Sequence, residues 1–143
     1  MATTNQVTTK WLGNMAFEST NLSGHNLRID ASPDDGGEGS GFRPKALMLS
    51  GLAGCSSLDV AMLIKKMKLE VDDFLIETIA NLTDEHPKYY ESVVVEYHFY
   101  GGNLNEAKLQ RAVDLSVEKY CGVMEMFRRF AKMEIKTVFH NQG

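Results

Sequence analysis

The sequence predicts an α+β protein in which the sheets are mainly antiparallel. Strand-like segments occur in groups rather than in alternation with helices, which is typical of this class. A long apolar helix separates the first group from the second, and two shorter helical segments precede the last strand. At 143 residues the chain has the length of one domain, and we expect a single domain over residues 1–143.

The N-terminal third predicts three short strands joined by turns. Residues 7–12 are rich in β-branched and aromatic side chains, and residues 26–31 alternate polar with apolar side chains. A less regular strand is expected over residues 15–20. Residues 32–41, with four glycines, one proline and three acidic residues, are expected to form a solvated loop, because the ligand spacing of an EF-hand calcium site is absent.

A long apolar segment begins at Pro44, where proline fits the first turn of a helix because its missing N–H costs nothing there. From Ala46 to Ile64 nearly every residue is apolar or small. A helix that is apolar on nearly all sides is a buried helix. Because one chain of this length can hardly surround it, we expect a homodimer that buries the two long helices between sheets.

The C-terminal part predicts two strands, two helical segments and a final strand, in the order 74–82, 92–100, 103–119, 123–130 and 134–139. The first two strands are expected to pair as an antiparallel hairpin, because both are rich in β-branched and aromatic residues. Asn103 or Asn105 is expected to cap the first of the two helices, and Gly122 to interrupt the helical run.

Charge and composition argue against several classes of protein. Fifteen Lys and Arg against nineteen Asp and Glu give a net charge of −4, which argues against a nucleic-acid binder. We see no signal peptide and no run of about 18 consecutive apolar residues that would span a membrane, and we expect a cytoplasmic protein without membrane contact. The four histidines lack metal-ligand spacing and no Gly-rich phosphate loop is present, so no metal and no bound cofactor are expected.

Two cysteines, Cys55 and Cys121, are the candidates for chemistry, and they lie 66 residues apart. A structural disulfide is not expected, because small secreted scaffolds use more cysteines at closer spacing. Each cysteine lies in a predicted helical segment beside small residues, so two packed helices could bring the sulfurs together. Inert core thiols are the alternative, since free cysteine is among the most buried residue types.

The segments around these cysteines resemble the OsmC/Ohr family of thiol-dependent reductases of organic hydroperoxides. The stretch from Pro44 to Cys55 is similar to the family's proline-led helix, in which the reactive cysteine comes eleven residues after the proline. Residues 116–121 (SVEKYC) resemble the segment that bears the second, resolving cysteine. Residues 24–28 (GHNLR) resemble the strand that carries the active-site arginine of the OsmC branch. The resemblance covers nearly the whole chain and implies the family's intertwined homodimer, with mainly antiparallel sheets around two long buried helices.

The resemblance also implies a mechanism. Cys55, as a thiolate, attacks the peroxide oxygen and becomes a sulfenic acid, and Cys121 condenses with it to a disulfide. A dithiol reductant then restores both thiols. Because a free cysteine has a pKa of about 8.5, a fixed cation must activate Cys55. Arg28 is the first candidate for that cation and Arg43 the second, although a solvated strand residue is the alternative for Arg28.

The chain departs from the family pattern at one place. Many family members carry a glutamate one or two residues after the proline, where it orients the arginine. Here Lys45 and Ala46 occupy those positions. Either Lys45 helps to stabilise the thiolate, or another acid such as Glu38 holds Arg28, or the peroxidase activity is weak.

The alternative function is therefore a catalytically weak dimer that binds a hydrophobic small molecule. Methionine and phenylalanine side chains are available to line an apolar cleft for such a ligand or for an organic hydroperoxide, among them Phe42, Met48, Met124 and Phe127. Plain core packing is the competing interpretation of these side chains, because methionine and aromatic residues at helical spacing usually fill a core.

Overall fold

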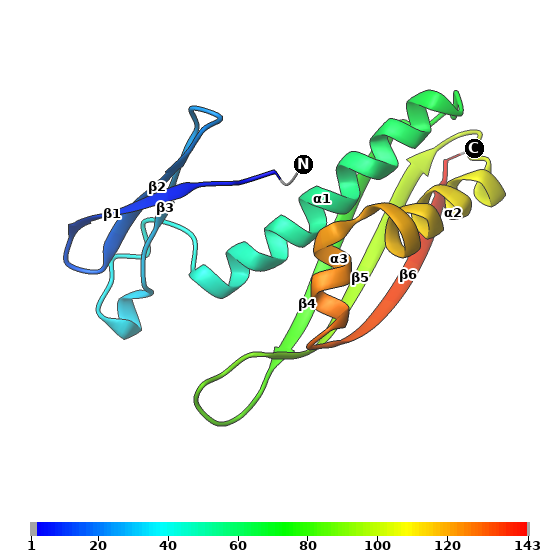
Figure 1. The fold of residues 1–143 in the computed structure, drawn as a ribbon. Coiled ribbons are helices and arrows are strands. Elements are labelled where there is room, and N and C mark those ends of the chain that lie inside the picture. Colours follow the sequence, from blue (N-terminus) through cyan, green and yellow to red (C-terminus); the bar gives the residue numbers. More distant parts are fainter. Residues whose placement is uncertain (1–2, 143) are drawn as a thin grey trace. The chain divides into compact units, whose positions relative to one another are not determined.

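The structure is a computed structural model that describes residues 3–142. The chain separates into two compact units, Met1–Met48 and Leu49–Gly143, and each contains its own three-stranded sheet (Figure 1). The predicted α+β class is confirmed, because helices and sheets occur in separate groups along the chain. A single domain over residues 1–143 stays a prediction.

The first unit is a meander of three antiparallel strands, β1 (Val7–Gly13), β2 (Ala16–Asn21) and β3 (Asn26–Ile29), in the order β1-β2-β3. The turn between β1 and β2 uses left-handed backbone at Gly13 and Asn14, which have φ values of 107° and 49°. All three strands lie where the sequence predicts them.

The segment after β3 is a mostly exposed loop, as predicted, and it folds back on that strand. It contains a 3-10 turn, η1 (Pro33–Asp35), and Phe42 returns to pair with Ile29 in an isolated parallel bridge. Gly37 permits this return, because a Cβ atom there would lie 2.1 Å from the carbonyl oxygen of Ala31. The side chain of Asp30 is enclosed by the segment and is only 2% exposed.

Helix α1 (Pro44–Lys66) starts at the predicted proline. Within one chain only part of its surface is buried, which agrees with the expectation that a chain of this length can hardly surround it. One stripe is buried, made of Leu52, Ser56, Val60 and Leu63. Leu58 and Met62 on other sides are 74% and 53% exposed, and the homodimer expected to cover such residues stays a prediction.

Among the described residues, α1 is the helix whose length and composition would allow it to cross a membrane. A count of consecutive apolar residues misses this property because serines, glycines and Asp59 interrupt the run. Core helices of soluble proteins have the same property, so it is weak evidence for a membrane span.

The second unit has the strand order β4-β5-β6, with β4 (Asp73–Leu82), β5 (Tyr90–Gly101) and β6 (Lys132–Asn141). The predicted hairpin is confirmed, since β4 and β5 are antiparallel. Strand β6 runs parallel to β5, because two helices carry the chain back between them. Alternate residues of the central strand β5 are buried, among them Val93, Val95, Tyr97 and Phe99.

The two returning helices are α2 (Glu106–Leu115) and α3 (Gly122–Arg128). The side chain of Asn105, rather than Asn103, caps α2 by accepting the N–H of Lys108 at 3.1 Å. The helix predicted to reach residue 119 is α-helical only to Leu115, and a π turn, η2 (Ser116–Tyr120), follows. Residues of α1, α2, α3 and β5 form one core on one face of the sheet (Figure 1).

Candidate active site

The two cysteines meet in the core of the second unit. Cys55 lies on α1, is partly buried and packs against the core cluster that includes Cys121. Cys121 lies between the π turn η2 and α3 and is 3% exposed. Both are free thiols, and the Cys55 thiol is close enough to affect the titration of Cys121. The fold thus brings together the two thiols that the sequence singles out.

The backbone at Cys121 is extended, which ends the π turn and starts α3. The N–H of Cys121 donates to the carbonyl of Ser116 at 2.8 Å and closes the π turn, while its Sγ accepts the N–H of Met124 at 3.3 Å. Burial raises the pKa of Cys121 to about 11, the nearby Cys55 and Asp59 add to the rise, and the N–H of Met124 opposes it. Cys121 is therefore a neutral thiol at neutral pH.

A chain of buried hydroxyl groups, which we call the hydroxyl chain, lies beside the cysteines. It consists of Tyr97, Ser56 and Ser116 and ends at the carboxylate of Asp59. Ser56 Oγ lies 2.6 Å from the Tyr97 hydroxyl and 2.7 Å from Ser116 Oγ, and Ser116 Oγ donates to Asp59 Oδ2 at 3.0 Å. The three hydroxyl-bearing residues are 0% exposed. Burial raises the pKa of Tyr97 to about 12, with smaller contributions from Cys121 and Asp59, so the phenol keeps its proton.

Sequence reasoning missed the hydroxyl chain because its members come from three separate elements. One signal was available: the alternation of β5 directs Tyr97 toward the core, and a buried tyrosine hydroxyl requires a hydrogen-bond partner. Ser56, the partner of Tyr97, lies 41 residues before it in the sequence, and Ser116, the partner of Ser56, lies 60 residues after Ser56, so no local pattern connects them.

Arg28 lies on β3 in the first unit, where its Nε donates to Ser40 Oγ at 2.9 Å. Ser40 Oγ in turn donates to Asp30 Oδ2 at 2.6 Å, and the N–H groups of Ser40 and Glu38 each donate to the same oxygen at 3.1 Å. These hydrogen bonds, led by the one from the Ser40 side chain, lower the pKa of Asp30 to about 2. Asp30 is thus a buried, charged support for Arg28 that sequence reasoning missed.

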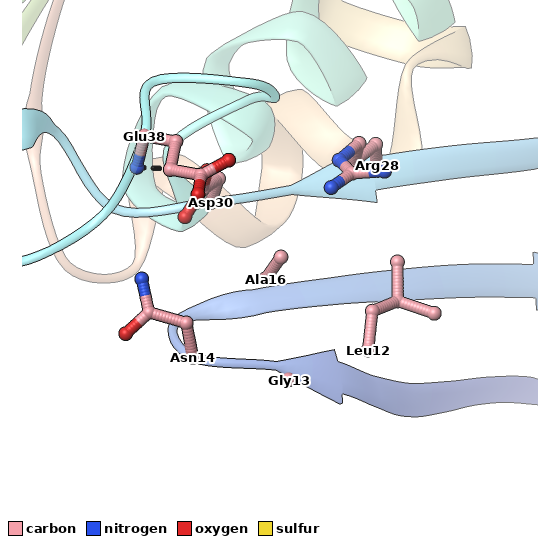
Figure 2. A pocket seen from close by; sticks show the side chains of 7 residues that line it. All are labelled: Leu12, Gly13, Asn14, Ala16, Arg28, Asp30 and Glu38. Carbon is pink, nitrogen blue, oxygen red and sulfur yellow. Dashed lines mark hydrogen bonds between the residues drawn. The ribbon is translucent and has the colours of Figure 1, made fainter.

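The acid suggested from the sequence, Glu38, does not hold Arg28 through its side chain. No ion pair joins Glu38 to Arg28 within residues 3–142, and Glu38 contributes its backbone N–H to Asp30. Arg28, Asp30 and Glu38 line a cavity of about 190 Å³ together with Leu12, Gly13, Asn14 and Ala16 (Figure 2). One cation and two carboxylates make this cavity polar, in contrast to the apolar cleft expected for an organic substrate.

The candidate activating cations, Arg28, Arg43 and Lys45, belong to the first unit, whereas both cysteines belong to the second. Activation of Cys55 by Arg28 therefore stays a prediction.

The apolar side chains proposed to line a substrate cleft divide into two groups. Met124 and Phe127 are 0% and 2% exposed and fill the core of the second unit, as the core-packing alternative expects. Phe42 and Met48 are exposed.

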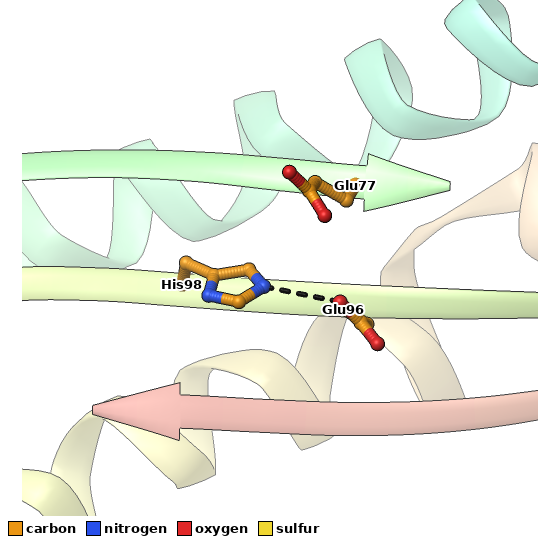
Figure 3. A group of neighbouring side chains, drawn as sticks. All are labelled: Glu77, Glu96 and His98. Atoms are coloured by element: carbon orange, nitrogen blue, oxygen red, sulfur yellow. Dashed lines mark hydrogen bonds and ion pairs between the residues drawn. The ribbon is translucent and has the colours of Figure 1, made fainter. Parts of the chain in front are cut away.

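Three side chains with metal-ligating atoms lie together on the sheet of the second unit. One ligand atom each of Glu77, Glu96 and His98 lies within 4.8 Å of the other two (Figure 3). Glu77 on β4 pairs directly with Glu96 on β5, a cross-strand relation that no local sequence spacing reveals. Both ring nitrogens of His98 already have partners, Glu96 at 3.2 Å and His140 at 2.9 Å, so the geometry alone does not require an ion. We assign no metal to this group.

Comparison with known proteins places the chain in a family. The model of the OsmC-like protein family matches residues 37–136. Protein YhfA of Escherichia coli K12 is 29% identical over 124 residues, which are 87% of this chain and 90% of that protein. A hypothetical protein from Aquifex aeolicus VF5 has a similar structure, with a TM-score of 0.86, 27% identity and coverage of 99% of this chain and 100% of that one.

The organic hydroperoxide resistance protein OsmC of Legionella pneumophila shares the fold, with a TM-score of 0.70, 18% identity and coverage of 96% and 98% of the two chains. The predicted resemblance is thereby confirmed. The matched residues 37–136 contain the two cysteine segments that suggested the resemblance, 44–55 and 116–121, whereas the Arg28 segment 24–28 lies before them. Since the match covers more than half of the sequence, the chain belongs to the OsmC-like protein family.

Proposed function

We propose that this protein reduces organic hydroperoxides, with Cys55 as the cysteine that reacts with peroxide and Cys121 as the resolving cysteine. The observation that carries the proposal is the meeting of two free thiols in one core, one partly exposed and the other almost fully buried. Likeness in fold to a protein described as an organic hydroperoxide resistance protein supports the choice of substrate class.

The reaction has three balanced steps. The Cys55 thiolate attacks the outer oxygen of the hydroperoxide, the O–O bond breaks, and a sulfenic acid and an alcohol are formed. The Cys121 sulfur then attacks the sulfenic sulfur, which forms the disulfide and releases one molecule of water. A dithiol reductant donates two electrons and two protons, which restores both thiols.

The environments of the two thiols suit this division of roles. Cys55 is the more accessible of the two, so an external peroxide meets it first. Cys121 is buried and has a raised pKa, so it remains protonated and unreactive until an electrophilic sulfur forms beside it. Arg28 is the proposed source of positive charge for Cys55. We further propose that the protein acts as a cytoplasmic homodimer.

The test is the consumption of tert-butyl hydroperoxide in the presence of a dithiol such as dihydrolipoamide. We expect Cys55→Ser to abolish consumption and Cys121→Ser to allow one round of oxidation without turnover. Equal rates for the wild type and Cys55→Ser would overturn the proposal.

A second candidate function is binding of a hydrophobic small molecule by a catalytically weak dimer. One observation favours it: Lys45 and Ala46 replace the family glutamate. The pH dependence of Cys55 alkylation in Cys121→Ser separates the two functions. A midpoint well below about 8.5 supports the enzyme, whereas an unshifted midpoint and a ligand retained in native mass spectrometry support the binder.

A further inference from the structure

The hydroxyl chain connects the two segments that carry the cysteines. Ser56 directly follows Cys55 on α1, and the carbonyl of Ser116 holds the N–H of Cys121 at 2.8 Å. The hydrogen bond of 2.7 Å between Ser56 Oγ and Ser116 Oγ therefore connects the segment of Cys55 to the segment of Cys121.

Tyr97 and Asp59 hold the two ends of this connection. Tyr97 extends from the central strand β5 and bonds Ser56 at 2.6 Å, which ties the chain to the sheet. Asp59 lies on α1 three residues after Ser56 and accepts the Ser116 hydroxyl at 3.0 Å. Ser116, at the start of the π turn, is therefore bound to α1 through two different side chains.

The direction of the hydrogen bonds follows from the chemistry of the last member. The Ser116 hydroxyl donates to the carboxylate oxygen Asp59 Oδ2, so its one proton is not available to Ser56. Ser116 must then accept from Ser56, and Ser56 must accept from Tyr97. The carbonyl of Ser56 lies 3.4 Å from Ser116 Oγ as a second acceptor for the same proton. Every hydroxyl proton of Tyr97, Ser56 and Ser116 therefore has an acceptor, and the three hydroxyl groups donate in one direction, from Tyr97 toward Asp59.

Because the three hydroxyl-bearing residues are 0% exposed, water does not replace a bond that breaks. Movement of α1 along the π turn would break the bonds of Ser116 to Ser56 and to Asp59 together. The hydroxyl chain therefore favours one relative position of the two cysteine segments.

We propose that Ser56, Ser116, Tyr97 and Asp59 are positioning residues that hold the two cysteines at the separation needed for disulfide formation. A disulfide forms only when the two Cα atoms lie within about 7 Å in a suitable orientation. Loss of the hydroxyl chain thus lowers the fraction of molecules in which the thiols can join. The effect falls on the second step, in which the sulfenic acid of Cys55 and the thiol of Cys121 form the S–S bond and water. To this extent the inference rests on the proposed function.

The test compares two phenylalanine variants and one alanine variant. Tyr97→Phe and Ser116→Ala each break the chain. Tyr90→Phe is the matched control, because it removes the same oxygen from another buried tyrosine of β5, one outside the hydroxyl chain. Each reduced protein is mixed with one equivalent of tert-butyl hydroperoxide, the sulfenic acid is trapped with dimedone, and the disulfide is quantified by mass spectrometry.

We expect Tyr97→Phe and Ser116→Ala to form the sulfenic acid within twofold of the wild-type rate. Disulfide formation should be at least fivefold slower, with sulfenic acid accumulating, while Tyr90→Phe follows the wild type. Circular dichroism shows which variants are folded, and Tyr97→Phe, which keeps the volume of the ring, tests the inference if Ser116→Ala does not fold.

A second measurement needs no peroxide. At equilibrium with reduced and oxidised glutathione, the two broken-chain variants should have at least fivefold less intramolecular disulfide, relative to dithiol, than the wild type and Tyr90→Phe. If the wild type forms no sulfenic acid with peroxide, the proposed function fails and the glutathione equilibrium still tests the inference. If the broken-chain variants match Tyr90→Phe in both measurements, the inference is overturned.

Discussion

Replacing Ser116 by alanine removes the oxygen at the centre of the hydroxyl chain. Ser116 Oγ lies 2.7 Å from Ser56 Oγ and 3.0 Å from Asp59 Oδ2. The substitution leaves the Ser56 hydroxyl, at a site of 0% exposure, without its acceptor, whereas the half-buried Asp59 retains access to water. A buried polar group without a partner costs about 1–3 kcal/mol, so we expect Ser116→Ala to lower the free energy of unfolding by about 2 kcal/mol.

The double variant Ser56→Ala/Ser116→Ala distinguishes this cause from a general packing defect. Ser56→Ala alone should cost about 1.5 kcal/mol, because alanine regains about 0.5 kcal/mol of helix propensity in α1. Once Ser116 is absent, however, the Ser56 hydroxyl has already lost its acceptor, so removing it costs only about 0.5 kcal/mol more, because Tyr97 then loses its partner. The double variant should therefore cost about 2.5 kcal/mol rather than the summed 3.5, which is a coupling of about 1 kcal/mol.

The assay is urea unfolding of the reduced proteins at one fixed protein concentration, since the stability of a dimer depends on concentration. Ser57→Ala is the matched control, because it makes the same change at the next residue of α1, outside the hydroxyl chain. Full additivity of the two substitutions, or single variants no less stable than Ser57→Ala, would refute the reasoning.

Three further outcomes are expected. Ser40→Ala removes the acceptor of Arg28 Nε and should lower the rate of tert-butyl hydroperoxide consumption about tenfold, and an unchanged rate would show that Ser40 does not support catalysis. The pKa of Asp30 is lowered from 3.8 to about 2, so the ionised carboxylate stabilises the folded protein above pH 3.8. This contribution is lost as the pH falls from 3.8 toward 2. The difference in unfolding free energy between wild type and Asp30→Asn should narrow over that range in urea titrations, and a constant difference would contradict this. In Cys55→Ser, the ultraviolet thiolate absorbance of Cys121 should appear well above pH 9, and a midpoint near 8.5 would show that burial does not control this thiol.

The elements of the fold could be predicted because their signals are local. Strand β5 (Tyr90–Gly101) extends only two residues before and one after the predicted strand 92–100, since β-branched and aromatic residues fill it. Helix α1 starts at Pro44 as expected, because proline marks a first helical turn whatever surrounds it. The parallel pairing of β6 with β5 needed knowledge of the path of the helices and was not predicted.

The candidate site was predictable only in part. Resemblance to a family singled out Cys55 and Cys121, and the fold brings them into one core. The π turn η2 before Cys121 replaces the last part of the predicted helix, and the tertiary hydrogen bonds of Ser116 accompany it. No propensity scale contains such bonds, because they join residues about 60 positions apart. The supporting groups of a site are therefore harder to predict than its reactive atoms.

The support of Arg28 bears on the choice between an enzyme and a binder. The resemblance assigns the orientation of the arginine to a glutamate, which this chain lacks at Lys45 and Ala46. Asp30 offers the same kind of support from within the first unit, since its buried, charged carboxylate holds Ser40, and Ser40 accepts from the guanidinium of Arg28. An oriented arginine therefore does not require the missing glutamate. Loss of that glutamate is thus weaker evidence for a purely binding function than the sequence indicates, and the paired thiols favour the enzyme.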